Sequence, residues 1–442
     1  MNPSDVLPDL PAAVCAVCIL LVPLAGAGLA LINTGLGRSR NAAHAMMSSL
    51  CVLAVAAVAY FICGFSWQGF PGRAAYAIEA GGKMWNWIGA DPLILRGVDF
   101  GGSSAPLGAS LGVSLAALLG MFSASLAVLI PLGSGAERWR LGSSCASAAI
   151  LAGWTYPLFA HWVWGGGWLA ELGANFGLGR GFADVGGAGT IHVVGGLTAL
   201  AIAWILRPRR GKFAQEGMPT AIPGHNTVFV LFGCLLALIG WLGLNTAGAI
   251  LYAGAGLGRV PLVAINTMLS ASSAALASAL ITRTRFRKPD ASLSANGWVG
   301  GLVASSAVCA FVIPAAAALI GLVAGALVTL SVEWLELYLH IDDPGGAISV
   351  HGMAGIWGLL ALGFFDHLPG SSGSYQWLAQ LVGVATLLGF VFPLTYALNR
   401  LLNRISPQRV GLDGERQGMD LNELGANAYP ELVTHQEDFT PR

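Results

Sequence analysis

WVGGLVASSAVCAFVIPAAAALIGLVAGALVTL, residues 298–330, is a run of 33 residues without one charged side chain. An α-helix needs about 20 apolar residues to cross the hydrocarbon core of a bilayer, so the run is longer than one span requires. Similar apolar stretches occur at 11–31 and 227–244. The chain as a whole has 55% hydrophobic and only 10% charged residues. This composition predicts an all-α membrane protein that is solvated by the lipid bilayer.

The hydropathy pattern divides the chain into eleven expected spans, near 11–33, 44–65, 106–134, 142–164, 186–206, 226–246, 259–282, 297–313, 316–338, 346–366 and 376–399. The 61 Gly residues favour close helix packing, because lipid supplies no hydrophobic force between helices and contact depends on backbone approach. The expected domains are a transmembrane channel domain, 1–404, and a polar tail, 405–442. Within the first domain, 11–206 and 226–366 are two halves and 376–399 is an extra helix.

The distribution of Lys and Arg predicts the orientation of the chain. Of the 22 basic residues, 17 fall in alternate loops and in the segment after residue 399. The other side of the membrane has five, namely Arg73, Lys83, Arg96, Arg180 and Arg259. By the positive-inside rule the N-terminus is outside and the tail is cytoplasmic, so we expect a multi-pass protein of the cell inner (cytoplasmic) membrane.

Charge and cysteine usage exclude other classes. The formal net charge is zero, which gives no reason to expect a nucleic-acid partner. The seven cysteines are scattered through apolar segments, and only Cys15 and Cys18 are close in sequence. This spacing is typical of small buried residues, so we expect no disulfide framework, no metal site and no cofactor.

The chain also contains an internal repeat. Residues 184–192, DVGGAGTIH, and residues 343–351, DPGGAISVH, both read D-x-G-G-A-x-[ST]-[IV]-H. The two copies open the fifth and tenth expected spans, which cross the membrane in opposite directions. This is the pattern of an inverted five-plus-five repeat, in which the substrate path lies between the halves near mid-membrane.

Each copy of the repeat ends on a histidine, His192 or His351. Both are expected about one and a half turns inside their spans, where an ionisable side chain is costly unless it faces a cavity or a partner. We expect the two rings to face each other, and the apolar surroundings favour the neutral imidazole form. The alternative is that each is a hydrogen-bonded packing residue.

Six motifs in order resemble those of the ammonium transporter family, which includes the Amt, MEP and Rhesus proteins. They are GAERWRL (135–141), HWVWGGGWL (161–169), GGAGTIHVVGG (186–196), IGWLGLN (239–245), DDPGGAISVHGMAGIWG (342–358) and GMDLNELGANAY (418–429). The resemblance implies an ammonium channel or transporter, not an enzyme, with His192 and His351 as twin pore histidines. It also implies an external recruitment site for NH4+ at Trp164 and Asp184. Trp164 could instead anchor the membrane interface, and Asp184 could simply cap its helix.

Several positions depart from the family pattern. Ungapped counting from Glu137 and Arg138 places Ser123 at the first of the family's two stacked phenylalanines, beside Phe122. Leu244 occupies the second gate position, and Gly248 replaces the serine of the recruitment site. We therefore expect a wider or differently plugged entrance, with an apolar constriction at Leu244 and a small-residue wall at Ser123 and Gly248.

The expected mechanism binds NH4+ outside, removes a proton and passes NH3 through the apolar pore, because a full charge is costly there. An ammonium-binding membrane sensor with little conduction is the alternative, and a di-histidine metal enzyme is a third reading that lacks further ligands. The family also implies a homotrimer and a PII-type signalling protein at the cytoplasmic face. Leu424 and Ala426 depart from the family's tail motif, which weakens the expectation that the tail docks against neighbouring subunits.

Overall fold

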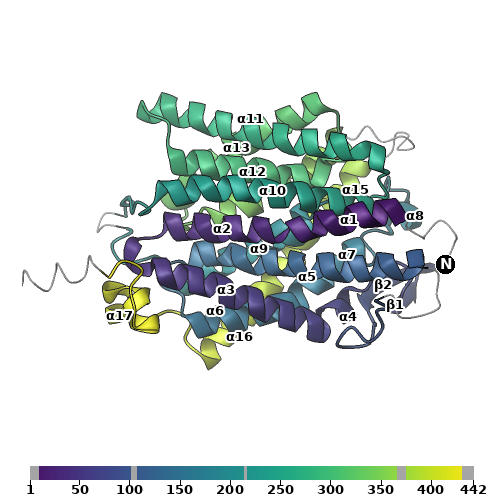
Figure 1. Cartoon of the computed structure of the whole chain (residues 1–442), viewed down its shortest axis with the longest axis horizontal. Coiled ribbons are helices and arrows are strands. Elements are labelled where there is room, and N and C mark those ends of the chain that lie inside the picture. Colours follow the sequence, from purple (N-terminus) through teal and green to yellow (C-terminus); the bar gives the residue numbers. More distant parts are fainter. Residues whose placement is uncertain (1–8, 101–106, 214–216, 366–374, 431–442) are drawn as a thin grey trace, which may run out of the picture.

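The computed structural model describes residues 9–100, 107–213, 217–365 and 375–430, which form a bundle of long helices (Figure 1). The first half contains α1 (Asp9–Leu21), α2 (Pro23–Leu36), η2 (Ser39–Asn41), α3 (Ala42–Ala59), η3 (Tyr60–Gly64), α4 (Phe65–Gln68), β1 (Ala75–Ala80), β2 (Lys83–Gly89), α5 (Leu107–Gly135), α6 (Leu141–Ile150), η4 (Leu151–Thr155), α7 (Tyr156–Trp164), α8 (Leu172–Phe176), η5 (Ala188–Val193) and α9 (Val194–Leu206). The second half contains α10 (Thr227–Tyr252), η6 (Leu257–Arg259), α11 (Val260–Phe286), α12 (Ala291–Val308), α13 (Pro314–Leu337), η7 (Ile348–Met353), α14 (Ala354–Phe365), α15 (Gln376–Thr386), η8 (Leu387–Val391), α16 (Phe392–Ile405), α17 (Leu412–Gln417) and η9 (Asp420–Leu424).

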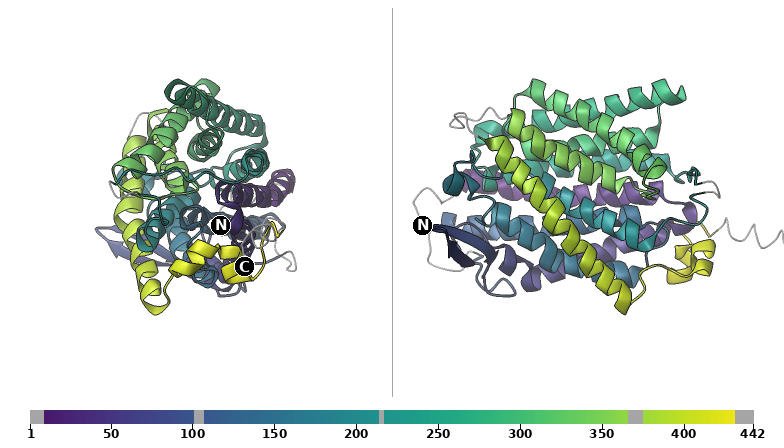
Figure 2. Two further views of the ribbon diagram at one scale, coloured as in Figure 1. Left: turned by 90° about the vertical axis from the view of Figure 1, so that its left-hand side faces the viewer. Right: turned by 180° about the vertical axis from the view of Figure 1, so that it is seen from behind.

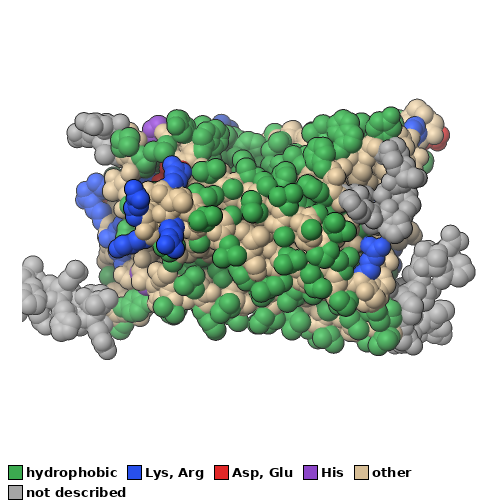
Figure 3. Space-filling model, turned by 90° about the horizontal axis from the view of Figure 1, so that it is seen from above, with side chains coloured by type: hydrophobic (Ala, Val, Ile, Leu, Met, Phe, Trp, Pro, Cys, Tyr) green, Lys and Arg blue, Asp and Glu red, His purple; other side chains and the backbone are tan. Residues whose placement is uncertain are grey.

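Within the described ranges, nine helices are long and apolar enough to cross a membrane. Their outer faces expose large side chains such as Leu50, Leu235 and Leu276, and Figure 3 shows a broad apolar band around the middle of the molecule. The chain is therefore a multi-pass, all-α membrane protein. The two other stretches where spans were expected are also helical, from Leu141 to Trp164 and in α12.

The long apolar run at 298–330 folds as two helices. α12 ends at Val308 and α13 begins at Pro314, where proline occupies the first helical position. Proline is tolerated there because the first helical N–H groups have no partner within the helix. The predicted division of this run near residue 313 is confirmed.

The two ends of the bundle differ. The antiparallel hairpin β1–β2 lies at one end, which we call the hairpin end, and α17 and η9 lie at the other, the tail end (Figures 1 and 2). The sequence analysis did not predict the hairpin. The face drawn in Figure 3 has more Lys and Arg side chains at the tail end than at the hairpin end.

Small residues bring helices together in the core. A Cβ on Gly28 in α2 would lie 2.5 Å from the backbone oxygen of Gly233 in α10, so only glycine permits this approach. Gly325 in α13 meets the backbone of Ala274 in α11 in the same way. The expected packing through small residues is therefore present. On the far face, the helix formed by α15, η8 and α16 runs obliquely across the bundle (Figure 2, right).

The chain after α16 folds back onto the tail end. The Asp420 carboxylate accepts hydrogen bonds from the backbone of Ala43 and His44 at 3.2 and 2.7 Å. The Glu423 carboxylate accepts from the Leu141 backbone at 2.7 Å and pairs with His44 at 3.2 Å. This segment is docked despite its departures at Leu424 and Ala426, because Asp420 and Glu423 make the contacts.

Candidate functional site

The two copies of the sequence repeat form two matching helix starts. The second glycine of each D-x-G-G has a left-handed backbone, with φ of 88° at Gly187 and 67° at Gly346. Glycine adopts this conformation without a steric penalty, which explains why the motif needs it. Each copy then continues as a π-helical turn, η5 or η7, which carries the histidine.

Asp184 caps the first of these helices. Its carboxylate accepts from the backbone of Gly187, Gly189 and Thr190 at 3.1, 2.9 and 2.8 Å, and from the Thr190 hydroxyl at 2.9 Å. Burial raises the pKa of Asp184 to about 6, although these hydrogen bonds favour the charged form. The carboxylate is therefore ionised at neutral pH. Asp343 caps the second helix by accepting from Ile348 N at 2.8 Å.

The two helices cross at glycines that each follow a histidine by four residues. A Cβ on Gly196 would lie 2.5 Å from the Gly352 nitrogen, and one on Gly355 would lie 2.8 Å from the Ala188 oxygen. Both contacts involve backbone atoms, which cannot move aside as a flexible side chain can. The crossing therefore fixes the separation of the two histidine-bearing turns.

His192 and His351 face each other at this crossing. Their Nδ1 atoms are 3.3 Å apart, and the ring centroids are 5.3 Å apart with a 27° angle between the planes. The opposite face of His192 stacks on Trp241, at 4.9 Å and 11°. The rings are buried, and Nε2 of His192 has no hydrogen-bond partner. The sequence predicted the facing pair, but it gave no sign of the Trp241 stack.

Trp164, the last residue of α7, lies on the hairpin side of this pair. Its indole stacks on Tyr252 at 4.5 Å and 5°, and its N–H donates to the backbone oxygen of Asp184 at 2.7 Å. A Cβ on Gly187 would lie 3.1 Å from the Trp164 ring. The side chain is 3% exposed, so it lies within the bundle and is not a surface anchor at the lipid interface.

The structure agrees only in part with the expected apolar constriction at Leu244 and small-residue wall at Ser123 and Gly248. Leu244 and Ser123 are buried, but Gly248 packs against the backbone oxygen of Val185. Gly248 therefore allows α10 to approach the Asp184 loop and lines no open wall. Phe122 is half-buried. Ser123 lies next to the Tyr156 side chain, a neighbour that the sequence analysis did not predict.

Two small cavities lie toward the tail end of the pair. The first has a volume of about 20 Å³, room for one water molecule, and its wall is made of Leu29, Ile32, Asn33, Ile130, Asn296, Val299, Gly345, Ala347, Val350 and His351. The second, of about 30 Å³, shares Asn33 with the first and reaches His44 and Glu137. Asn33 therefore separates two small spaces between His351 and the docked tail.

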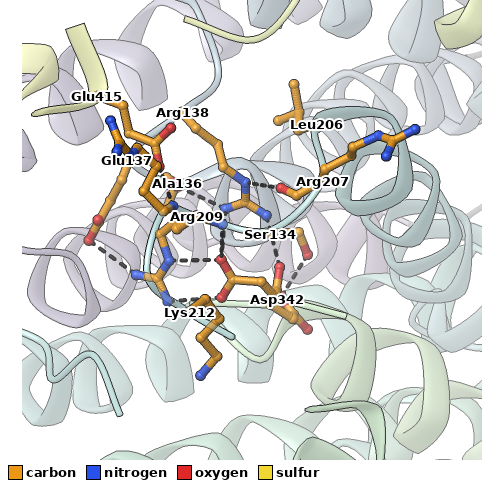
Figure 4. A network of polar contacts seen from close by, with 12 residues as sticks. Ser134, Ala136, Glu137, Arg138, Leu206, Arg207, Arg209, Lys212, Asp342 and Glu415 are labelled. Atoms are coloured by element: carbon orange, nitrogen blue, oxygen red, sulfur yellow. Dashed lines mark hydrogen bonds and ion pairs between the residues drawn. The ribbon is translucent and has the colours of Figure 1, made fainter. Parts of the chain in front are cut away.

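A charged network surrounds the start of η7 at the tail end (Figure 4). Arg209 makes a bidentate contact with the Asp342 carboxylate at 2.9 and 2.9 Å, and Arg138 donates to the Asp342 backbone oxygen at 2.9 Å. Burial alone would raise the pKa of Asp342, but the two guanidiniums lower it to about 2. Glu137 pairs with Arg209 at 3.2 Å. The sequence analysis had used Glu137, Arg138 and Asp342 as parts of family motifs and had counted Arg138 and Arg209 among the basic residues of one side, but it did not predict this network.

Another buried histidine, His161, has Nδ1 2.8 Å from the Gln68 backbone oxygen and Nε2 3.1 Å from the Asn86 amide oxygen. It is a packing residue of the kind considered for the pore pair. The described part of the chain holds no group of three or more His, Cys, Asp or Glu residues that could bind a metal ion.

Comparison with known proteins gives a consistent result. A family model described as the Ammonium Transporter Family matches residues 13–429. The ammonium transporter Amt2 of Archaeoglobus fulgidus is 35% identical, with 96% of this chain and 89% of that protein covered. The ammonium transporter of Bacillus subtilis is 30% identical, with 94% and 97% covered.

Two solved structures share the fold. One described as "Sensor Amt Protein" has a TM-score of 0.82 and 27% identity, and it covers 93% of this chain and 98% of its own. Mep2 of Candida albicans has a TM-score of 0.78 and 22% identity, with 93% and 89% covered. Since the family model and the relatives extend over nearly the whole chain, this chain belongs to the ammonium transporter family.

Proposed function

We propose that this ammonium transporter binds NH4+ beside Trp164, removes its proton, and passes NH3 along an apolar path lined by His192 and His351. The observation that supports the proposal is the pair itself. The Nδ1 atoms of two buried imidazoles lie 3.3 Å apart where two helices that begin with π-turns cross, and one of the rings has an unpartnered Nε2. Such a nitrogen can exchange a hydrogen bond with a small polar solute.

The proposed selectivity rests on the cost of charge in an apolar path. A cation of the size of K+ or NH4+ loses its hydration on entering, and the walls around His351 offer few replacement oxygens. NH4+ avoids this cost by leaving a proton behind, whereas K+ cannot. The Trp164 and Tyr252 ring faces attract a cation through their quadrupoles before that step.

Asp184 supports recruitment through its charge and not through direct contact. Both of its oxygens already accept hydrogen bonds from the start of η5. A carboxylate ionised at neutral pH still favours a cation nearby, because screening inside the bundle is weak. Helix capping and cation recruitment are thus compatible roles for Asp184.

The same proposal includes an inner-membrane topology of eleven spans with an inverted five-plus-five repeat. The two matching helix starts, with their capping aspartates and glycine crossings, favour the repeat. The greater number of basic side chains at the tail end in Figure 3 favours a cytoplasmic tail and an external N-terminus. The tail end would then also be the place for a PII-type regulator, and the assembly would be a homotrimer.

An ammonium sensor with little conduction is the second candidate. It is favoured by the 27% identity to a structure described as a sensor Amt protein. A sensor would keep the binding site and lose the flux.

Flux measurements on purified protein in liposomes separate the two candidates. We expect an imposed inward NH4+ gradient to alkalinise the lumen faster than in protein-free vesicles, because entering NH3 takes up a proton there, and an equal K+ gradient to have no effect. Vesicles with the His161→Gln variant serve as a control for a buried histidine outside the path. Ammonium binding without any flux would assign the sensor function, and absence of both would refute the proposal.

A further inference from the structure

A serine near the end of α12, Ser306, contacts both parts of the chain that place His192. Its backbone oxygen, among the last carbonyls of the helix, accepts from the Gly186 nitrogen at 2.7 Å, in the loop that leads into η5. Its side-chain oxygen accepts from the indole N–H of Trp241 in α10 at 3.1 Å. Since η5 carries His192 and Trp241 stacks on it, both contacts lead to the same imidazole ring.

The direction of the hydrogen bond between Ser306 and Trp241 is fixed. A serine hydroxyl has one hydrogen, and the backbone oxygen of Leu302, one turn earlier in α12, lies 3.1 Å from Oγ and receives it. The lone pairs of Oγ are then left for the Trp241 N–H, which can only donate. Both residues are 0% exposed, so bulk water does not compete for this contact.

The His192 ring lies between two flat groups. Trp241 covers one face at 4.9 Å and 11°, and His351 covers the other at 5.3 Å and 27°. Nε2 of His192 has no hydrogen-bond partner among the described residues, so no bond at that atom sets its direction. The orientation of the ring therefore depends on the planes of its two neighbours, and the bond at the edge of the Trp241 indole restrains one of these planes.

The preceding residue, Ser305, makes the same kind of contact with a different consequence. Its Oγ accepts from the side-chain amide of Asn245 in α10 at 3.2 Å and lies 2.6 Å from the same α12 carbonyl. Two adjacent serines thus hold α10 one turn apart. Ser305 holds an amide, whereas Ser306 holds the ring that is stacked on His192.

We propose that Ser306 is a positioning residue for His192. Its hydroxyl holds the Trp241 indole parallel to the His192 ring, so that Nε2 of His192 keeps one direction in the path. The inference rests on the proposed function, in which this nitrogen exchanges a hydrogen bond with the passing solute. Ser306 acts through Trp241 and needs no contact with the solute itself.

Removal of the hydroxyl in Ser306→Ala tests this role. The backbone oxygen at 306 remains, so the bond to Gly186 and the start of η5 stay in place. Trp241 loses its acceptor, and we expect its indole to tilt and ammonium flux into liposomes to fall about two- to tenfold, as for loss of one neutral hydrogen bond. Ser305→Ala is the matched control, because it deletes the same group one residue earlier, and its flux should stay near that of the wild type.

The orientation of His192 is measured separately, by solid-state NMR of protein labelled with 15N-histidine in lipid bilayers. The His192 signals are those that disappear in His192→Asn, and the ring current of the stacked indole shifts them. We expect these signals to move or broaden in Ser306→Ala and to stay unchanged in Ser305→Ala. Unchanged signals in Ser306→Ala, or equal changes in both variants, would overturn the proposal, because a general loss of packing is not specific to one serine.

A double-mutant cycle tests whether Ser306 acts through Trp241. Trp241→Phe keeps an aromatic face toward His192 but has no N–H. In that background Ser306→Ala should change neither the His192 signals nor the flux any further. A further change as large as in the wild-type background would show that Ser306 acts by another route. If the wild type passed no ammonium, the proposed function would fail, while the NMR signals would still decide whether Ser306 positions His192.

Discussion

Replacing Gly196 by alanine tests whether the helix crossing sets the geometry of the histidine pair. The added methyl carbon would lie 2.5 Å from the nitrogen and 2.8 Å from the Cα of Gly352. Comfortable carbon contacts are about 3.5–4.0 Å, so the two backbones must separate by roughly 1 Å. Overpacking of this kind costs about 1–3 kcal/mol.

The displacement acts directly on His192 and His351, because His351 immediately precedes Gly352. Their Nδ1 atoms are 3.3 Å apart, near the upper limit for a hydrogen bond. A further separation on the order of 1 Å breaks the contact. We therefore expect Gly196→Ala to lower both the thermal midpoint in detergent and the rate of ammonium uptake in a transporter-deficient strain.

Gly352→Ala is the matched control for this experiment. It lies in the same crossing, but a Cβ on Gly352 would have no atom within 4 Å. Alanine also has the higher helix propensity, so this variant should be at least as stable as the wild type. Equal stability and equal uptake for the two variants would refute the idea that the crossing positions the pair.

Three further predictions follow from the site and the assembly. His192→Asp or His351→Asp places a carboxylate in the path, so K+ flux into liposomes should appear before ammonium transport is lost. The exposed residue change His340→Asp is the control. If either pore variant still excluded K+, the histidines would not be the selectivity element. Asp342→Asn leaves the buried guanidiniums of Arg138 and Arg209 without their anion and should cost about 3–5 kcal/mol in unfolding free energy. Since the pKa of Asp342 is lowered to about 2, its stabilising contribution is complete above the ordinary value of 3.8 and is lost as pH falls toward 2, so Asp342→Asn should also flatten the acid limb of the stability profile. Mass determination in detergent or lipid should give a homotrimer, and a stable monomer would contradict the assembly.

The sequence predicted the bundle and the histidine pair because both depend on short-range patterns. Apolar length gave the spans, and the repeated D-x-G-G-A motif placed His192 and His351 at equivalent points. The second glycine of the D-x-G-G motif has a left-handed backbone in both copies. The local sequence therefore determines the geometry of each helix start. No long-range information was needed for these predictions.

The π-helical turns and the Trp241 stack could not be predicted in this way. A π-turn inserts one residue into a helix whose hydropathy is already uniform, so the pattern around His192 gives no signal of it. Trp241 stands in a span rich in apolar residues, where its ring looks like ordinary core. Only the crossing of α10 with η5 shows that its face covers His192.

The polar surroundings of Ser123 were missed for a different reason. Counting along a family motif compares one position at a time. It showed that Ser123 stands where the family has a phenylalanine, and it could not show which side chain from another helix occupies the space of that ring. Tyr60, the first residue of η3, lies beside α5 at this level, and its hydroxyl fits there only because residue 120 is a glycine. Ser123 and Gly120 are small on the same helical face, three residues apart, and together they admit a tyrosine with its hydroxyl. The aromatic ring that is absent at residue 123 is thus matched by a tyrosine ring from a neighbouring element, and this exchange involves positions far apart in the sequence.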